Sequence, residues 1–116
     1  MSEKGKMKLY VSGPMSGIAE WNFPAFFRAE EFLLGQGFEV LNPARQGAPE
    51  GLDPLKATLL EPLHLQKWKE YLAGDIATIL RESEGVVLLP GWKKSSGAVL
   101  EALVAAFSRL EVFELI

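Results

Sequence analysis

The chain has 116 residues, of which 48% are hydrophobic and 23% are charged, and its formal net charge is −3. This length suits one domain with a single core, and the composition is ordinary for a globular protein. The acidic balance argues against a general binder of nucleic-acid polymers, because such proteins usually carry a basic face.

The scarcity of two residue types narrows the possible chemistry. Cysteine is absent, which excludes disulfides, thiolate zinc sites and cysteine nucleophiles. The single histidine, His64, disfavours a histidine-rich metal site or a serine–histidine triad. We therefore expect no metal and no cofactor, and any acid–base chemistry falls to carboxylates, tyrosine or lysine.

The start of the chain carries no sign of a targeting segment. Residues 1–6 are polar and too short for a signal peptide, and no apolar run approaches the length of a membrane span. We expect a cytoplasmic protein without membrane contact. One domain is predicted over residues 1–116, with residues 1–6 flexible.

The first half of the chain predicts a strand, a helix and a second strand. Residues 8–12 are rich in strand-forming side chains and are followed by Gly13 and Pro14. Residues 23–36 carry apolar side chains at helical spacing, with Asn22 as the expected N-cap and glycines at the end. Residues 38–41 predict the next strand.

The second half repeats the alternation after a long connection. Residues 44–62 contain three prolines and two glycines, and long connections of this kind are usually functional or mobile. Residues 63–82 predict a helix, and the continuous apolar run 85–89 is typical of a central parallel strand. Residues 95–110 predict a third helix, anchored by its bulky apolar side chains, and residues 112–116 a last strand.

This alternation predicts an α/β architecture. Right-handed β-α-β crossovers would give a small Rossmann-like (flavodoxin-like) three-layer fold with a mainly parallel four-stranded sheet in the order 2-1-3-4. Ligands of such sheets bind where the strand order reverses, outside the carboxyl ends of the first and third strands. The residues that we expect to contact a ligand there are Gly13, Met15, Gly91, Trp92, Ser95, Ser96 and Gly97.

Glu101 is the sharpest candidate for a catalytic group. It lies about one turn into the third predicted helix, and its helical neighbours Gly97, Ala98 and Ala105 are small enough to leave space beside the carboxylate. The alternative is an ordinary glutamate on a solvated face. Its position next to the expected ligand crevice favours a functional role.

Three further features each have a functional and a structural interpretation. Ser95 to Gly97, with Lys93 and Lys94 before them, could bind a phosphate or sugar hydroxyl at a helix start, or could be a plain N-cap. Tyr10 could face the ligand or could pack. Asp75 could be exposed, or could share the crevice with Glu101, giving the two carboxylates that glycosidic chemistry needs.

The motifs together resemble a known family. The segments Leu9-Tyr-Val-Ser-Gly-Pro-Met15, Asn22-Phe-Pro, Gly37-Phe-Glu-Val-Leu-Asn-Pro43, Leu89-Pro-Gly-Trp92 and Ser95-Ser-Gly-Ala-Val-Leu-Glu101, with Asp75, resemble DUF4406, a phage and bacterial family related to the nucleoside 2-deoxyribosyltransferases. The resemblance covers nearly the whole chain from Lys8 onward.

The resemblance implies roles for the candidate residues. In the wider superfamily, which includes hydrolases of nucleoside 5′-monophosphates, a glutamate at the position of Glu101 is the nucleophile. Asp75 matches an aspartate that helps to protonate the leaving base, and Tyr10 matches a tyrosine that orients the glutamate. Ser95 replaces the aspartate that holds the sugar 5′-hydroxyl in the transferases, which removes repulsion toward a 5′-phosphate.

We therefore expect N-glycosidic bond cleavage or transfer on a nucleoside 5′-monophosphate through a covalent glycosyl–glutamate intermediate. One alternative is a non-catalytic nucleotide-binding or sequestering module. Another is a small oligomeric adaptor that uses Trp21 and the apolar C-terminus as contact surfaces. The expected partner is a small nucleoside or nucleotide, not a polymer, and relatives imply a homo-oligomer.

Overall fold

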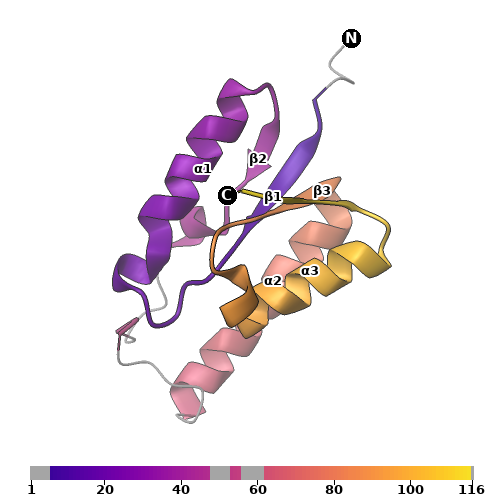
Figure 1. Ribbon diagram of the computed structural model, residues 1–116. Coiled ribbons are helices and arrows are strands. Elements are labelled where there is room, and N and C mark those ends of the chain that lie inside the picture. Colours follow the sequence, from indigo (N-terminus) through magenta and orange to yellow (C-terminus); the bar gives the residue numbers. More distant parts are fainter. Residues whose placement is uncertain (1–5, 48–52, 56–61, 116) are drawn as a thin grey trace.

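The computed structural model describes residues 6–47, 53–55 and 62–115. Strands and helices alternate along the chain, as Figure 1 shows. The elements are β1 (Lys8–Ser12), α1 (Phe23–Gly35), β2 (Glu39–Leu41), α2 (Pro62–Glu82), β3 (Gly85–Leu88), α3 (Ser96–Phe107) and β4 (Glu111–Glu114), with short 3-10 turns η2 (Ala19–Asn22), η3 (Pro43–Gln46) and η4 (Trp92–Lys94).

The four strands form one parallel sheet in the order β2-β1-β3-β4, which confirms the predicted topology. Tyr10 in β1 pairs with Leu41 in β2 and with Val86 in β3. The predicted bounds differ by a few residues at most. The largest difference is the third helix, which ends at Phe107 rather than at residue 110.

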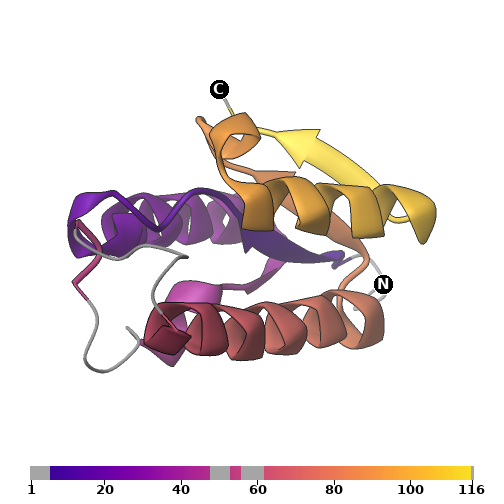
Figure 2. The ribbon, with the colours of Figure 1, turned by 90° about the horizontal axis from the view of Figure 1, so that it is seen from below.

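Alternate residues of the central strands face opposite layers, as the period of a strand requires. Leu9 and Val11 of β1 pack against α1, in a cluster that includes Phe26. Tyr10 faces the other way and packs in a cluster with Ile79 of α2 and Ala105 of α3. Figure 2 shows α2 and α3, which contact each other, as the helices on this second side.

The third helix contacts the sheet mainly through small side chains, and among its bulky residues Val104 is half-buried against the core. Ala98, Glu101 and Ala105 are buried, whereas Leu103 is 49% exposed and Phe107 is 84% exposed. The expectation that the bulky residues anchor this helix is therefore wrong for Leu100, Leu103 and Phe107, which are exposed. Alanine lets the helix approach the sheet closely, and the larger residues are left on the outer face.

The turn before α1 also differs from expectation. Glu20, Trp21 and Asn22 all have left-handed backbone angles, and this turn buries Trp21, which is therefore not a surface contact residue. Asn22 precedes α1 but makes no side-chain cap hydrogen bond, and its Nδ2 donates to the carbonyl oxygen of Pro14 at 2.9 Å. The side chain closes the loop instead of capping the helix.

An ion pair holds the start of the long connection to α1. Arg45 in η3 makes a bidentate contact with Glu30, with Nη2–Oε2 at 2.7 Å and Nε–Oε1 at 3.0 Å. Asn42 donates to the same carboxylate at 2.8 Å and accepts from the backbone N–H of Ala44. These bonds lower the pKa of Glu30 and fix η3 beside the carboxyl end of β2.

No helix in the described ranges combines the length and the apolar character needed to cross a membrane.

Gly13 is required by packing. A Cβ placed there would lie 2.8 Å from Cβ of Leu89, whereas a Cβ at Gly35 would meet no atom within 4 Å. Gly13→Ala should therefore lower the free energy of unfolding by about 1–3 kcal/mol, because the strand ends must separate. The matched control Gly35→Ala should leave it unchanged or raise it by up to about 1 kcal/mol. Urea titration would measure both, and equal stabilities would contradict the assignment.

Candidate active site

A pocket of about 230 Å³ opens at the carboxyl ends of β1 and β3, where the strand order reverses. Its walls come from the loop after β1, from α1, from α2 and from the start of α3. The volume lies just below the range of about 300–1,000 Å³ usual for small-molecule sites. The pocket therefore suits a small molecule and lies where the topology predicted a ligand crevice.

Glu101 lines this pocket although its side chain is only 6% exposed. Ser12 Oγ donates to Glu101 Oε1 at 2.6 Å, and the Tyr10 hydroxyl lies 3.5 Å from Oε2. The second distance exceeds the usual range for an O–H···O bond. Ser12 is therefore the closer partner, and its role was missed from the sequence because serine is common at the ends of strands.

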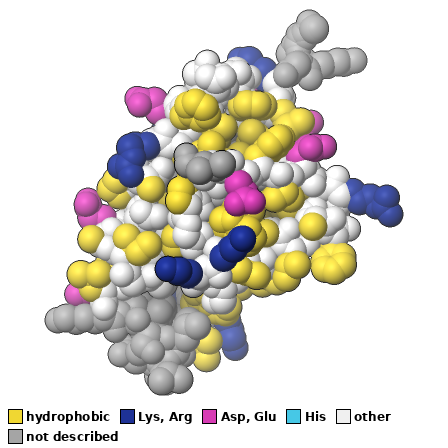
Figure 3. Space-filling view, viewed as in Figure 1, with side chains coloured by type: hydrophobic (Ala, Val, Ile, Leu, Met, Phe, Trp, Pro, Cys, Tyr) yellow, Lys and Arg dark blue, Asp and Glu magenta, His cyan; other side chains and the backbone are white. Residues whose placement is uncertain are grey.

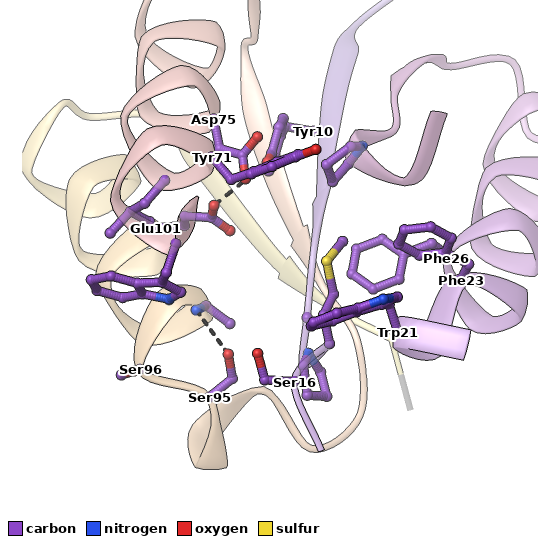
Figure 4. Close-up of a pocket in the computed structure, with 18 of the residues that line it drawn as sticks. Tyr10, Ser16, Trp21, Phe23, Phe26, Tyr71, Asp75, Ser95, Ser96 and Glu101 are labelled. Carbon is purple, nitrogen blue, oxygen red and sulfur yellow. Dashed lines mark hydrogen bonds between the residues drawn. The ribbon is translucent and has the colours of Figure 1, made fainter. Parts of the chain in front are cut away.

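Asp75 reaches the same pocket from α2, so the structure brings together the two carboxyl groups that the sequence could not place relative to each other. Gln46 Nε2 lies 3.5 Å from Asp75 Oδ1. Figure 4 shows Asp75, Tyr10 and Glu101 on one side of the pocket. The arrangement provides two carboxyls of different environment next to one cavity.

The burial of these groups changes their acidity. Desolvation raises the pKa of Glu101 to about 8, against the lowering effect of the Ser12 hydrogen bond, and raises the pKa of Asp75 to about 6. Burial, followed by the charges of Glu101 and Asp75, also raises the pKa of the Tyr10 phenol, so that it stays a hydrogen-bond donor. Near neutral pH the two carboxyls therefore hold one proton between them.

The start of α3 forms another part of the pocket wall. Ser95, Ser96 and Gly97 all line the pocket, and Lys94 and Lys67 add positive charge to the lining. Ser95 is also the N-cap of the helix, because its Oγ accepts from the backbone N–H of Ala98 at 3.2 Å. The cap and the pocket-lining position coexist, since a hydroxyl that accepts one bond can still donate another.

The opposite wall is aromatic, which the sequence analysis did not predict. Figure 4 shows Trp21, Phe23 and Phe26 together on the side of the pocket that faces away from the carboxyls. Trp68 and Tyr71 of α2 also line the pocket, and Figure 4 shows Tyr71 on the side of the carboxyls, beside Asp75. The dense aromatic spacing before and within the first helix was the available signal, but the helix was interpreted as core packing and Trp21 as a contact surface.

Of the predicted ligand contacts in the two loops, Gly13 and Met15 line the pocket but Gly91 and Trp92 do not. Trp92 Nε1 instead donates to Glu114 Oε1 at 3.2 Å, and Lys93 lies over its ring at 5.8 Å from the centroid. Gly91 has a left-handed backbone angle and serves the turn. Trp92 thus lies against the end of β4 and not in the pocket, which differs from the prediction.

No group of three or more histidine, aspartate or glutamate side chains in the described ranges is placed to hold a metal ion.

Comparison with known families places the chain. The sequence model of a family described as "Domain of unknown function (DUF4406)" matches residues 7–114, which is nearly the whole chain. The chain belongs to the DUF4406 family. No match was found among curated proteins. The description of the DUF4406 family assigns no activity to its members.

The raised pKa of Glu101 predicts how stability depends on pH. The ordinary pKa of a glutamate, 4.5, applies in the unfolded chain, and the folded value is about 8. The wild type should therefore lose stability relative to Glu101→Gln as pH rises from about 4.5 to 8, by up to about 1.4 kcal/mol per pH unit.

Urea unfolding at pH 5 and pH 8 would measure this difference. Glu31→Gln is the matched control, because Glu31 is exposed on α1 and its substitution should not produce the trend. If the curves of wild type and Glu101→Gln stay parallel over this range, Glu101 is not a buried, proton-holding group.

Proposed function

We propose that the protein cleaves or transfers the N-glycosidic bond of a nucleoside or deoxynucleoside 5′-monophosphate. The observation that carries the proposal is the pair Glu101 and Asp75, two carboxyls from different helices that line one small pocket and alter each other's pKa. Such a pair can divide the roles of nucleophile and proton donor. The motifs that resemble the deoxyribosyltransferase superfamily support the same chemistry.

In the first step Glu101, as the carboxylate, attacks C1′ of the sugar. The bond from C1′ to the base nitrogen breaks, its electron pair goes to the base, and a glycosyl ester of Glu101 forms. Near neutral pH the single proton of the pair lies on Glu101, whose pKa is the higher of the two, so it must first pass to Asp75. Asp75 then gives this proton to the leaving base. The single proton held by the pair thus suits one nucleophile and one acid.

In the second step the ester is resolved. Water attacks C1′ in a hydrolase, and Glu101 leaves as the carboxylate while the proton of the water passes to Asp75. In a transferase a second base takes the place of water. Both outcomes use the same residues, and access of water to the pocket decides between them.

The cationic part of the lining favours a phosphorylated substrate. Lys67 and Lys94 lie in the wall together with the start of α3, where backbone N–H groups and the helix dipole favour an anion. Ser95 offers a hydroxyl there in place of a carboxylate. The aromatic wall around Trp21 supplies apolar surface for a base. Nucleotides of this kind are cytoplasmic metabolites, and we place the protein in that compartment.

One observation favours a non-catalytic nucleotide-binding module instead. Burial raises the pKa of Glu101 to about 8, so the free protein at neutral pH would carry its proton on the expected nucleophile. A protonated Glu101 could donate to a ligand without attacking it. This second candidate predicts tight binding of an intact nucleotide and no release of base.

Incubation with a panel of nucleosides and 5′-monophosphates, followed by chromatography for free base, would test the proposal. The wild type should release base from at least one monophosphate faster than from its nucleoside. Glu101→Gln should lower the rate on the order of 10⁴-fold, because the nucleophile is gone. Glu31→Gln should keep the wild-type rate. Full activity of Glu101→Gln, or no release from any substrate, would refute the glycosidase proposal.

We further propose that the protein is a homodimer joined through α3. Except for the buried Glu101, this helix has no charged residue, and Leu100, Leu103 and Phe107 are exposed along its outer face. Figure 3 shows hydrophobic side chains gathered over α3. A helix that is apolar on all sides is usually buried, and an uncharged face can pair with its own copy about a two-fold axis without repulsion.

Phe107→Asp should weaken this association about tenfold or more, because it removes a large apolar side chain from the contact and adds two like charges. Sedimentation velocity over a concentration series would measure the change. Phe32→Asp is the control, since Phe32 is 53% exposed on α1 and lies outside the proposed contact. Monomeric wild type, or equal effects of both variants, would contradict the α3 dimer.

A further inference from the structure

The two oxygens of the Glu101 carboxyl have different surroundings. Oε1 accepts from Ser12 Oγ at 2.6 Å, a distance typical of an O–H···O bond to an ionised group. The hydroxyl nearest to Oε2 is that of Tyr10, at 3.5 Å, and the Asp75 carboxyl lies within interaction distance of the Glu101 carboxyl. One oxygen is therefore held by a short bond to a hydroxyl, and the hydroxyl nearest to the other oxygen is distant.

The strand places Ser12 for this contact. It is the last residue of β1, it is 1% exposed, and it lies two residues after Tyr10, so both side chains point to the face that α3 covers. Val11, between them, points to the α1 side. A buried hydroxyl on a central strand has little freedom to move, which makes it a rigid support for the carboxyl.

We propose that Ser12 is a positioning residue that holds Glu101 through Oε1 and thereby directs Oε2 toward the ligand. The reactive role of Oε2 rests on the proposed glycosidase function, whereas the hold on Oε1 does not.

The hydrogen bond fits both chemical steps. When Oε2 bonds to C1′ and the base leaves with the electron pair of the broken bond, Oε1 becomes the carbonyl oxygen of the ester and still accepts from Ser12. When water attacks C1′, the electron pair of the C1′–Oε2 bond returns to the carboxylate, which Ser12 again stabilises. Removing the hydroxyl should therefore disfavour every state in which Glu101 is ionised.

The first test is the pH profile of kcat/KM on a substrate that the wild type cleaves. Ser12→Ala should move the acidic limb upward by about one pH unit, which is about a tenfold loss of rate below the limb. Ser12→Cys, of similar size and with a weak donor, should move it in the same direction. Ser12→Thr keeps the hydroxyl and should return the acidic limb to the pH of the wild type.

Val11→Ala separates this role from a structural one. It truncates a buried neighbour on the opposite face of the same strand, so it should lower the melting temperature without moving the limb. If Ser12→Ala lowers stability and leaves the limb where Val11→Ala leaves it, Ser12 is only a packing residue and the proposal is overturned.

The second test does not need activity. The carboxyl carbon of Glu101, assigned in labelled protein by its absence from the spectrum of Glu101→Gln, can be titrated by NMR. Its midpoint should rise in Ser12→Ala and return in Ser12→Thr. An unchanged midpoint overturns the hold on Oε1. A raised midpoint in a protein that cleaves no nucleotide supports the hold and refutes the glycosidase function alone.

Discussion

The burial of the Glu101 carboxyl beside the end of β1 is the constraint on which the pocket and the packing of α3 depend. Burying Glu101 is unfavourable unless the group is neutral or well hydrogen-bonded, and the structure provides both compensations. Ser12 donates to one oxygen, and Asp75 competes for the proton. The pKa of Glu101, about 8, reflects the desolvation cost that these interactions leave uncompensated. Glu101 is therefore a group whose ionisation depends closely on its surroundings.

The burial of Glu101 also explains which face of α3 lies against the sheet. Glu101 reaches Ser12 only if the helix lies close to the sheet, and the small side chains of Ala98 and Ala105 permit that approach. Because the inner face of α3 is occupied by these small side chains and Glu101, the large residues Leu103 and Phe107 lie on the outer face. The chemistry at the inner face of α3 and the apolar surface at its outer face are consequences of one packing choice.

The wall of the pocket opposite the carboxyls depends on the turn before α1 and on η3, the short turn after β2. The left-handed backbone at Glu20 and Trp21 is strained, at about 1–3 kcal/mol for each residue, and this turn places Trp21 in the wall. The ion pair between Glu30 and Arg45 secures η3 on the surface of α1. The turn at Trp21 and the ion pair between Glu30 and Arg45 thus position the residues on this side of the pocket.

The sequence by itself determined the fold, because alternating apolar runs and helical spacing reflect local rules that hold for any chain of this pattern. It also placed Glu101 near the strand-order reversal. It could not decide whether Asp75 or Trp92 faces the pocket, which face of α3 is inside, or that Ser12 holds Glu101. Those outcomes depend on the rotation of each helix about its axis and on contacts such as that between Ser12 and Glu101, which are 89 residues apart. Only the tertiary packing fixes such distances, since no local preference of the chain encodes them.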